Sequence, residues 1–302
     1  MQQAGFETIL VAMNDKYNCC ICGNSCDTPA KVAKVHSNVR DFASETFNLW
    51  KCPSCGSIHS QDQVDLDYYY SKYPFFGQKL DWAVKSSYRG LLRRLKRAGL
   101  SEDAKILDFG CGSGLLVKYL RSQGYNAAGY DKFNDQFNLP DLLFERFDCV
   151  IAQDVIEHAP KPQTVLDQLG ALAKPGGLIF IGTPNAAGIN LDKPEKFIHP
   201  LHQPYHRHIF SIDALKKCAA NQNWDLVKYY STPYTNMPGL SLPFLHHYMR
   251  AGDGTLNVLF DRKISPTFWL NPLTYFLLIT GYFLCDDADI VAIFRKQISA
   301  EE

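Results

Sequence analysis

The chain of 302 residues carries 31 Lys and Arg against 31 Asp and Glu, so its formal net charge is zero. This length allows one large domain and a small one with an ample core, and a neutral balance gives no long-range field toward nucleic acid or an anionic membrane. The N-terminal sequence MQQAGFETILVAMNDKYN lacks a basic start followed by an apolar core, so we expect no secretory signal and a cytoplasmic location.

Cysteine spacing near the N-terminus indicates a metal site. The chain contains ten cysteines, and in a reducing compartment a metal site explains them better than a disulfide framework. The segments CCICG and CPSCG each hold two thiols three positions apart, with 29 residues between Cys22 and Cys52. Such a pair can bind one ion from a tight turn, and the trailing glycine relieves the backbone where amides face the sulfur. We therefore predict a zinc ribbon over residues 1–60, with short strands at 31–39 and 45–50.

Four thiolates would leave no open coordination position, so this zinc is expected to be structural. Cys20 and Cys26 compete as ligands, but only Cys22 and Cys55 are followed by glycine. The predicted ligands are Cys19, Cys22, Cys52 and Cys55.

Residues 61–100 are predicted to link the ribbon to the rest of the chain. The run VDLDYYYSKYPFF carries four tyrosines that could close over a ligand or, more commonly, pack one domain against another. Residues 85–99 have the spacing of an amphipathic helix, with Tyr88 and three leucines inward and five basic residues outward. A basic face would suit nucleic acid, but the neutral total favours a solvated helix face.

The stretch AKILDFGCGSGLLVKYLRSQGYNAAGYD, residues 104–131, predicts a βαβ unit: strand 105–109, glycine turn 110–114, helix 115–122 and strand 126–130. Glycines let the backbone approach a ligand, and a carboxylate ending the second strand, here Asp131, can accept both hydroxyls of a ribose. Dinucleotide sites usually show G-x-G-x-x-G, whereas this turn is G-x-G-x-G with Asp108 before it. That carboxylate would repel a pyrophosphate but could pair with the ammonium group of an amino acid.

Further along, strands are predicted at 147–153, 178–182, 223–230 and 290–295, with helices at 164–173 and 212–221. Ser211 is expected to cap the second helix. The run DVIEH, residues 154–158, follows the carboxyl end of a strand, where open α/β sheets bind ligands. Taken alone, Glu157 and His158 could equally be a helix cap and its neighbour.

Four histidines lie close together at positions 199, 202, 206 and 208. On a helix, His202 and His206 would share one face and could bind a metal, but two nearby prolines disfavour that helix and hence a second metal site. A histidine near its ordinary pKa can take a proton from a hydroxyl or from a carbon beside a carbonyl. Catalysis is therefore the favoured use of this segment.

Together, D-x-G-x-G-x-G from Asp108 and the distal Asp131 resemble the S-adenosylmethionine (SAM) site of class I methyltransferases. The DVIEH run and the KPGG turn at 174–177 are similar to a group that includes ubiquinone-pathway O-methyltransferases and zinc-ribbon-bearing sugar C-methyltransferases. The resemblance covers residues 17–230 and the last strand. It implies an α/β fold with a Rossmann-like, mostly parallel core sheet, in which the last strand pairs antiparallel with the strand at 224–230.

The resemblance also implies roles for individual residues. The cofactor-binding residues are expected to be Asp108, Gly110, Cys111, Gly112, Gly114, Asp131 and Asp154. In the similar group, a histidine two residues before an aromatic-Ser pair faces the active site, and that position here is His208. The expected catalytic residues are His208 as general base, with His206 or Glu157 assisting.

Two departures from the family pattern are expected. Only sixteen residues separate Asp131 from Asp148, so the third strand should be reduced or absent, with Asn138, Leu139 and Asp141 as weak substitutes at the adenine end. About sixty residues, rich in aromatics and proline, also replace the usual short hairpin before the last strand. Topology and breaks in its apolar run exclude a single membrane span. This insertion could be a lid over an apolar substrate, a subunit interface or an in-plane membrane contact, and the first two are favoured.

We therefore predict a SAM-dependent methyltransferase divided into a ribbon (1–60), a linker with an amphipathic helix (61–100), a SAM-binding core (101–230) and an insertion with the final strand (231–302). Its expected substrate is a small metabolite, sugar nucleotide or glycan, with O-methylation slightly ahead of C-methylation. One alternative is an RNA methyltransferase that holds RNA with its ribbon, which the neutral charge disfavours. The other is a non-catalytic SAM-fold binding platform. The sequence allows a homo-oligomer.

Overall fold

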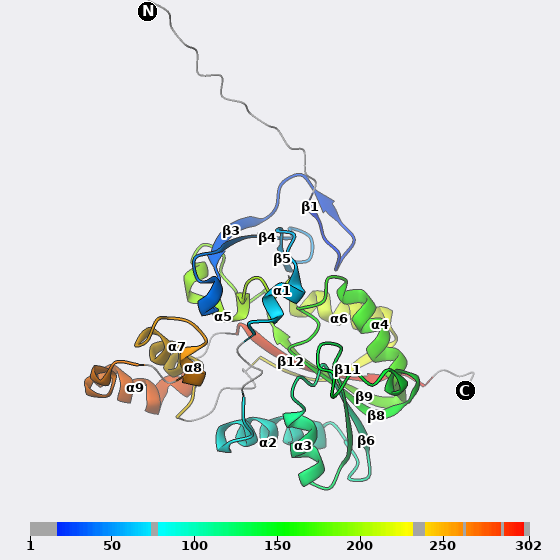
Figure 1. Cartoon of the computed structure of the whole chain (residues 1–302). Helices are drawn as coiled ribbons and strands as arrows, with labels where there is room; N and C mark the ends of the chain where they lie inside the picture. The colour runs from blue at the N-terminus through cyan, green and yellow to red at the C-terminus, as the bar shows by residue number, and fades with distance from the viewer. Residues whose placement is uncertain (1–16, 74–77, 232–238, 262–263, 285–286, 299–302) are drawn as a thin grey trace, which may run out of the picture.

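The computed structural model describes residues 17–73, 78–231, 239–261, 264–284 and 287–298 (Figure 1). Its centre is a six-stranded sheet in the order β11-β12-β9-β8-β6-β7. The strands are β6 (Lys105–Phe109), β7 (Asn126–Tyr130), β8 (Phe147–Gln153), β9 (Ala173–Pro184), β11 (Trp224–Tyr230) and β12 (Asp289–Lys296). The pairs among β7, β6, β8 and β9 are parallel, whereas β12 is antiparallel to both of its neighbours. The predicted antiparallel pairing of the last strand is therefore confirmed.

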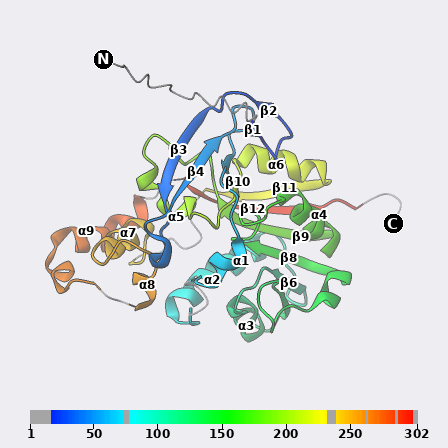
Figure 2. The same cartoon turned by 45° about the horizontal axis from the view of Figure 1, so that its top comes forward.

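Helices cover both faces of this sheet (Figure 2). On one face, α2 (Trp82–Arg97) and α3 (Leu115–Ser122) pack on Ile106 and Ile151. On the other, α4 (Pro162–Leu172) and α6 (Ile212–Asn221) pack on Leu107 and Val150. Because side chains alternate along a strand, neighbouring residues such as Ile106 and Leu107 serve opposite faces, and their strands are buried throughout. The predicted α/β, Rossmann-like fold class is confirmed.

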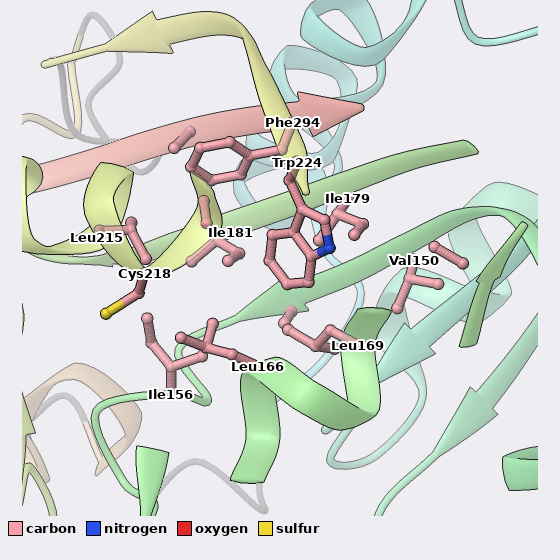
Figure 3. Packing of buried hydrophobic residues seen from close by; sticks show 14 of the residues in the cluster. Val150, Ile156, Leu166, Leu169, Ile179, Ile181, Leu215, Cys218, Trp224 and Phe294 are labelled. Carbon is pink, nitrogen blue, oxygen red and sulfur yellow. The ribbon is translucent and has the colours of Figure 1, made fainter. Parts of the chain in front are cut away.

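The second of these faces packs around one tryptophan (Figure 3). The indole of Trp224 lies against Leu169 of α4 and 6.0 Å from the ring of Phe294, measured between centroids. A Cβ at Gly170 would come within 3.0 Å of the indole, so glycine gives the ring its room in α4. This packing ties β11 and β12 to α4 and holds the far edge of the sheet.

The expected loss of the third strand is confirmed for the residues described between Asp131 and β8. That segment contains the 3₁₀ helix η3 (Pro140–Phe144), and β7 is an edge strand of the sheet.

Helix α2 begins three residues earlier than predicted because Asp81 caps it, accepting hydrogen bonds from the amides of Ala83 and Val84. Its buried residues include the three leucines expected to face inward. One of the five basic side chains predicted to face solvent, that of Arg94, instead lies over the ring of Tyr230 at 4.8 Å. Ser211 caps α6 as predicted, accepting from the amide of Ala214.

The N-terminal segment forms a two-stranded and a four-stranded sheet. The first pairs β1 (Tyr17–Asn18) with β2 (Ser25–Cys26), and the second has the order β10-β5-β4-β3. Its strands are β3 (Lys31–His36), β4 (Thr46–Lys51), β5 (Ile58–Ser60) and β10 (His208–Ile209), and the 3₁₀ helix η1 (Arg40–Phe42) joins β3 to β4. The last strand comes from the far end of the histidine segment. The predicted ribbon therefore shares a sheet with residues from the core, and its standing as a separate domain stays a prediction.

Three short helices lie in the connections: α1 (Leu66–Tyr70) in the predicted linker, and η4 (Pro194–Lys196) and α5 (Ile198–Leu201) in the histidine segment. The insertion between β11 and β12 holds α7 (Leu242–Arg250), α8 (Val258–Asp261), η5 (Pro266–Leu270), α9 (Pro272–Thr280) and η6 (Gly281–Phe283). Figure 1 shows these helices as a lobe beside the sheet, in orange. Among the described helices, none has the length and apolar composition needed to cross a bilayer.

Candidate functional site

A cavity of about 2320 Å³ opens at the carboxyl ends of β6, β7 and β8. Residues at these strand ends line it, together with the glycine turn, the DVIEH loop and the insertion lobe. Pockets for one drug-sized ligand are on the order of 300–1,000 Å³, so this cavity has room for two ligands side by side. Its place at the strand ends is where open α/β sheets bind their ligands.

The glycine turn supplies open space at one end of the cavity. Gly112 has φ of +53°, and a Cβ built there would meet nothing within 4 Å. Gly110 has φ of +78°, and a Cβ there would lie 2.5 Å from Cγ2 of Val155, so a side chain would collide with the next loop. A side chain at Gly110 would thus collide with the protein, whereas Gly112 leaves open space toward the cavity.

Asp108 lies beneath the turn and is only 5% exposed. Burial, and then the charge of Asp131, raise the pKa of its carboxyl to about 7. A buried carboxyl in that state gains most from a cationic ligand group, because a cation would restore the charged form.

Asp131 ends β7 and is already tied to the turn. Its Oδ2 accepts a hydrogen bond from the amide of Gly112 at 2.8 Å, and its Oδ1 accepts one from the amide of Phe133 at 2.8 Å. Each carboxylate oxygen retains acceptor capacity for a ligand hydroxyl. The site therefore presents two carboxylates and an open glycine position in one place, which fits the methionyl and ribose parts of SAM.

The remaining predicted cofactor residues are distributed differently. Cys111 and Asp154 line the cavity, and Asp154 has φ of +54°. Gly114 lies behind the turn, where a Cβ would come within 2.2 Å of the ring of Phe137. The residues suggested for the adenine end, Asn138, Leu139 and Asp141, lie outside the cavity lining of the described chain, which has Lys132 and Phe133 there instead.

The structure does not bring His208 to the cavity. As part of β10, its backbone pairs with β5, and its Nδ1 lies 3.0 Å from Nδ1 of His59. Its Nε2 lies 3.3 Å from the carbonyl oxygen of Pro160. Its expected orientation toward the active site is therefore corrected: strand pairing turns the imidazole toward the ribbon.

His206 does line the cavity, beside Glu157. Its Nδ1 lies 2.7 Å from the carbonyl oxygen of Pro200, and since a carbonyl can only accept, Nδ1 carries the proton and Nε2 holds the lone pair. That Nε2 is 3.9 Å from Oε1 of Glu157. Burial lowers the pKa of His206 to about 4, so the ring is neutral at physiological pH.

Glu157 is fully buried and does not cap a helix, because α4 begins only at Pro162. Its Oε2 accepts a hydrogen bond from Oγ1 of Thr183 at 2.9 Å, and its Oε1 has no hydrogen-bond partner in the described part of the chain. Burial, and then the charge of Asp154, raise the pKa of Glu157 well above its ordinary value. An uncharged carboxyl therefore sits beside an uncharged imidazole, an arrangement suited to moving a proton.

His158 completes this cluster, although the sequence did not single it out as catalytic. Its Nδ1 lies 2.8 Å from the hydroxyl oxygen of Tyr70, and its ring is 4.7 Å from that of His206 between centroids. Glu157, His158 and His206 offer ligand atoms within 4.8 Å of one another, so the cluster could also hold a cation. The pairing of His202 with His206 as metal ligands, which the sequence disfavoured, is not in this set.

Sequence reasoning also missed the aromatic and acidic wall opposite. Tyr70, Tyr73 and Tyr88 line the cavity, as does Asp289 at the start of β12. Burial, and then the charge of Asp154, raise the pKa of Asp289 to about 7. The tyrosine run was noted without a choice between packing and ligand contact, and Tyr69 packs on Phe42 while Tyr70 reaches the cavity. Nothing local marked Asp289, since its place depends on pairing with Pro184.

The four predicted ligand cysteines come together. Sγ of Cys19 is 3.6 Å from that of Cys55, Sγ of Cys22 is 3.8 Å from that of Cys52, and all four lie within 4.8 Å of one another. Four sulfurs at about 2.3 Å from a tetrahedral zinc are separated by about 3.8 Å. The cluster could thus hold a metal ion, and the competing Cys20 is exposed and outside it.

One histidine connects this cluster to the active-site loop. Nε2 of His59 lies 3.1 Å from Sγ of Cys19, while its Nδ1 contacts His208, which in turn contacts Pro160. The ring of His59 also stacks on Trp50, with 4.4 Å between centroids. The predicted base therefore belongs to a chain of contacts from the sulfur cluster to the loop after Glu157.

Residues 84–229 match the family model described as "Methyltransferase domain". The match confirms the resemblance to class I SAM-dependent methyltransferases of the group that includes the ubiquinone-pathway O-methyltransferases.

Two curated relatives illustrate the similarity. The ubiquinone biosynthesis O-methyltransferase of Xylella fastidiosa is 32% identical over 112 residues, covering 30% of this chain and 45% of the relative. Its counterpart in Salmonella typhi is 27% identical over 137 residues, covering 35% of this chain and 57% of the relative. The chain thus spans about half the length of the curated relatives it matches.

Solved structures show a looser likeness. The phosphoethanolamine N-methyltransferase 2 of Haemonchus contortus, in complex with SAM, has a TM-score of 0.47 at 16% identity, covering 88% of this chain and 69% of its own. The 1,6-didemethyltoxoflavin-N1-methyltransferase of Burkholderia thailandensis, with bound 1,6-didemethyltoxoflavin and S-adenosylhomocysteine, has a TM-score of 0.45 at 14% identity, covering 80% and 96%. The family assignment rests on the sequence match.

The state of Asp108 yields a stability prediction. Its folded pKa of about 7 lies above the ordinary 3.8, so the stability of the unliganded protein is highest below the lower value and falls as pH rises toward the higher one. Asp108→Asn does not titrate, so its free energy of unfolding should exceed that of the wild type at pH 8. The difference should shrink by at most ~1.4 kcal/mol per pH unit between pH 7 and pH 4.

Denaturant unfolding at pH 5, 6.5 and 8 measures this difference. The matched control is Asp135→Asn, because Asp135 is exposed on the loop that follows β7. A difference for Asp108→Asn that stays constant with pH would show that the carboxyl is not held in a raised-pKa state.

Proposed function

We propose that the protein is a SAM-dependent methyltransferase that transfers a methyl group to a hydroxyl of a small molecule, sugar nucleotide or glycan. The observation that carries this proposal is the joint position of Asp108, Gly112 and Asp131 at one end of a cavity that His206 also lines, with Glu157 buried beside that histidine. O-transfer is favoured because the curated relatives named above are O-methyltransferases. C-methylation is the second candidate.

The proposed cofactor contacts follow from the donor set. Asp108 would pair with the methionyl ammonium, and Asp131 would accept from the ribose hydroxyls while holding the amide of Gly112. Gly110 and Gly112 would leave room for the ligand backbone, with Cys111 and Asp154 beside it. Gly114 would contribute by shaping the turn, since it lies against Phe137.

The adenine end is proposed at Phe133. This ring lines the cavity and is stacked on Tyr70, with 5.0 Å between centroids and 16° between planes. A flat aromatic surface beside the ribose carboxylate suits a base. Phe133 would therefore replace the missing third-strand region, and Asn138, Leu139 and Asp141 are no longer needed for that part.

His206 is the proposed general base, in place of His208. When bound, SAM supplies a methyl group that its sulfonium makes electrophilic. The acceptor hydroxyl would give its proton to Nε2 of His206, and the acceptor oxygen would form the new bond to the methyl carbon in line with the leaving sulfur. Oε1 of Glu157 would face the imidazolium that forms and accept a hydrogen bond from it, and Tyr70 would orient His158 at the same site.

Zinc is the proposed occupant of the cysteine cluster, with Cys19, Cys22, Cys52 and Cys55 as ligands. Four sulfur ligands leave no open position, so the ion would be structural. His59 would donate from Nε2 to the Cys19 thiolate, as second-layer histidines do at such sites.

RNA methylation is less well supported. The chain has no net charge. The edge of the ribbon at β5 is paired with β10 and does not form a basic surface for RNA. A non-catalytic platform is opposed by the retained Asp108, Asp131 and Glu157–His206 pair.

The cofactor assignment predicts that Asp131→Ala weakens SAM binding about 10- to 100-fold, because a charge-assisted hydrogen bond is worth about 1.5–3 kcal/mol. Isothermal calorimetry of the unliganded protein measures it. Asp135→Ala, four residues further along the same loop, should leave the affinity for SAM unchanged. Equal affinities for the Asp131→Ala variant and wild type would overturn the assignment.

The base assignment predicts that His206→Ala lowers kcat by about 10²–10⁴-fold at saturating SAM without weakening SAM binding. Since burial lowers the pKa of His206 to about 4, wild-type kcat should stay flat from pH 8 down to about 5.5 and fall only as the pH approaches that value. Full turnover in His206→Ala combined with loss in His208→Ala would return the role of base to His208.

The zinc assignment predicts one zinc per chain by elemental analysis. Cys52→Ser should lose the ion and lower the unfolding midpoint by on the order of 10 °C, since structural metal binding is coupled to folding. Cys20→Ser is the matched control and should retain the ion. A protein purified without chelators that holds no zinc, or a Cys20→Ser protein that loses it, would contradict this ligand set.

A further inference from the structure

The outer part of the insertion lobe is an apolar surface. Its members lie between 269 and 284, and we call them the insertion face. The most exposed are Leu270 (82%), Phe283 (81%), Ile279 (73%), Phe276 (53%), Leu284 (51%), Tyr275 (49%) and Trp269 (48%). So many exposed apolar side chains in one short segment are uncommon in proteins surrounded only by water.

Helix α9 has the opposite burial pattern to that of an ordinary surface helix. Its single buried residue is Thr274, which is polar, whereas most of its leucine and aromatic side chains are exposed. Oγ1 of Thr274 donates to the carbonyl of Phe268 at 2.6 Å and lies 3.0 Å from Nε2 of His247. The helix therefore packs on α7 and η5 through a polar contact and leaves its apolar side chains unburied.

The insertion face offers few polar groups with which a partner could form hydrogen bonds. Residues 264–284 contain no Asp, Glu, Lys or Arg. The hydroxyl of Tyr275 donates to the carbonyl of Trp269 at 2.7 Å, and that of Thr280 donates to the carbonyl of Phe276 at 2.7 Å. Protein–protein interfaces usually have a polar rim with about one hydrogen bond per 100–200 Å². Internally satisfied hydroxyls among uncharged side chains suit hydrocarbon instead.

The position of the lobe fits a planar partner. Both views place α9 at the periphery of the molecule, away from the central sheet (Figures 1 and 2). With nine residues, α9 is too short to span a bilayer and could only lie in its surface. Aromatic side chains such as Trp269 and Tyr275 are those that settle at the boundary between headgroups and acyl chains.

The insertion face is continuous with the cavity. Trp269, Leu273 and Leu284 are each about half exposed and also line the cavity, with Leu277 and Leu278 further along its wall. A molecule held at the insertion face thus has an apolar path toward the Glu157–His206 pair. This part of the argument rests on the proposed function, whereas the surface itself does not.

We propose that the insertion face docks on the surface of a lipid bilayer and opens the acceptor end of the cavity to it. Contact through side chains without charge should depend little on headgroup charge or salt. The acceptor would then be an amphiphile whose hydroxyl reaches His206 while its apolar chain lies along the lobe. A second copy of the chain is the competing occupant, and the test below separates the two.

The test is co-sedimentation of the full chain with phosphatidylcholine vesicles in 0.5 M NaCl, without SAM. The wild type should bind, and a triple variant, Leu270→Ser, Ile279→Ser and Phe283→Ser, should bind at least about tenfold more weakly, since three apolar side chains would no longer enter the hydrocarbon. The matched control is Phe144→Ser, because Phe144 is 82% exposed on η3, outside the lobe. Quenching by brominated lipid should also fall in Trp269→Phe.

Two measurements keep the outcomes distinct. An unchanged SAM affinity in the triple variant shows that it is folded, so loss of vesicle binding then supports the proposal whatever the activity of the protein. A wild type that does not sediment with vesicles, or a wild-type dimer that the triple variant converts to a monomer without any vesicle binding, would overturn it in favour of a subunit interface. Failure of the methyltransferase proposal alone would appear as absent SAM binding with vesicle binding intact.

Discussion

The structure depends on a two-residue strand that connects the four-stranded ribbon sheet to the loop after β8. β10 pairs antiparallel with β5, His208 opposite His59 and Ile209 opposite Ile58. Just before it, the amides of Arg207 and His208 both donate to the carbonyl oxygen of Glu157, at 2.7 and 3.1 Å. The position of Glu157 at the cavity is therefore set by a segment that is itself held by the ribbon sheet. A metal ion in the cysteine cluster would act on the active site through this connection, by fixing β5 rather than by taking part in chemistry.

Near this connection, several acidic side chains occupy positions where they lower the stability of the folded protein. Asp108 and Asp289 line the cavity and Glu157 is buried beside His206, and all three have raised pKa values because burial disfavours the charged form. A structural core would replace such groups with apolar ones of similar size. Their cost makes sense only if a ligand supplies the missing partner, a cation at Asp108 and a transferable proton at Glu157. The concentration of perturbed groups at strand ends points to chemistry there.

Local patterns predicted most of the core, while pairing between distant segments decided the site. Residues 105–109, 115–122, 126–130 and 147–153 take the predicted elements because short buried runs bounded by glycine permit few alternatives. The four cysteines were likewise predictable because each pair is a local turn. The orientation of the His208 side chain could not be predicted from the sequence. A shift of one residue in the pairing of β10 with β5 would have placed this side chain on the opposite face of the strand. His206 precedes β10, so this pairing does not set the direction of its side chain, and it lines the cavity. Asp289, like His208, depends on strand pairing, in its case with Pro184 of β9.

The antiparallel last strand explains why the extra sixty residues lie where they do. Because β12 runs against β9, its first residue, Asp289, pairs with Pro184 at the carboxyl end of β9, which is the ligand edge of the sheet. The preceding strand, β11, ends at the same edge, with Tyr230 opposite Val291. The chain must therefore leave and re-enter the sheet beside the cavity, and lengthening this connection costs little because loop-closure entropy grows slowly with length. Any insertion at this point is placed over the acceptor side of the site. A short hairpin would leave that side open to water, whereas the lobe makes its wall from leucine and tryptophan, which would favour the proposed acceptor with apolar surface.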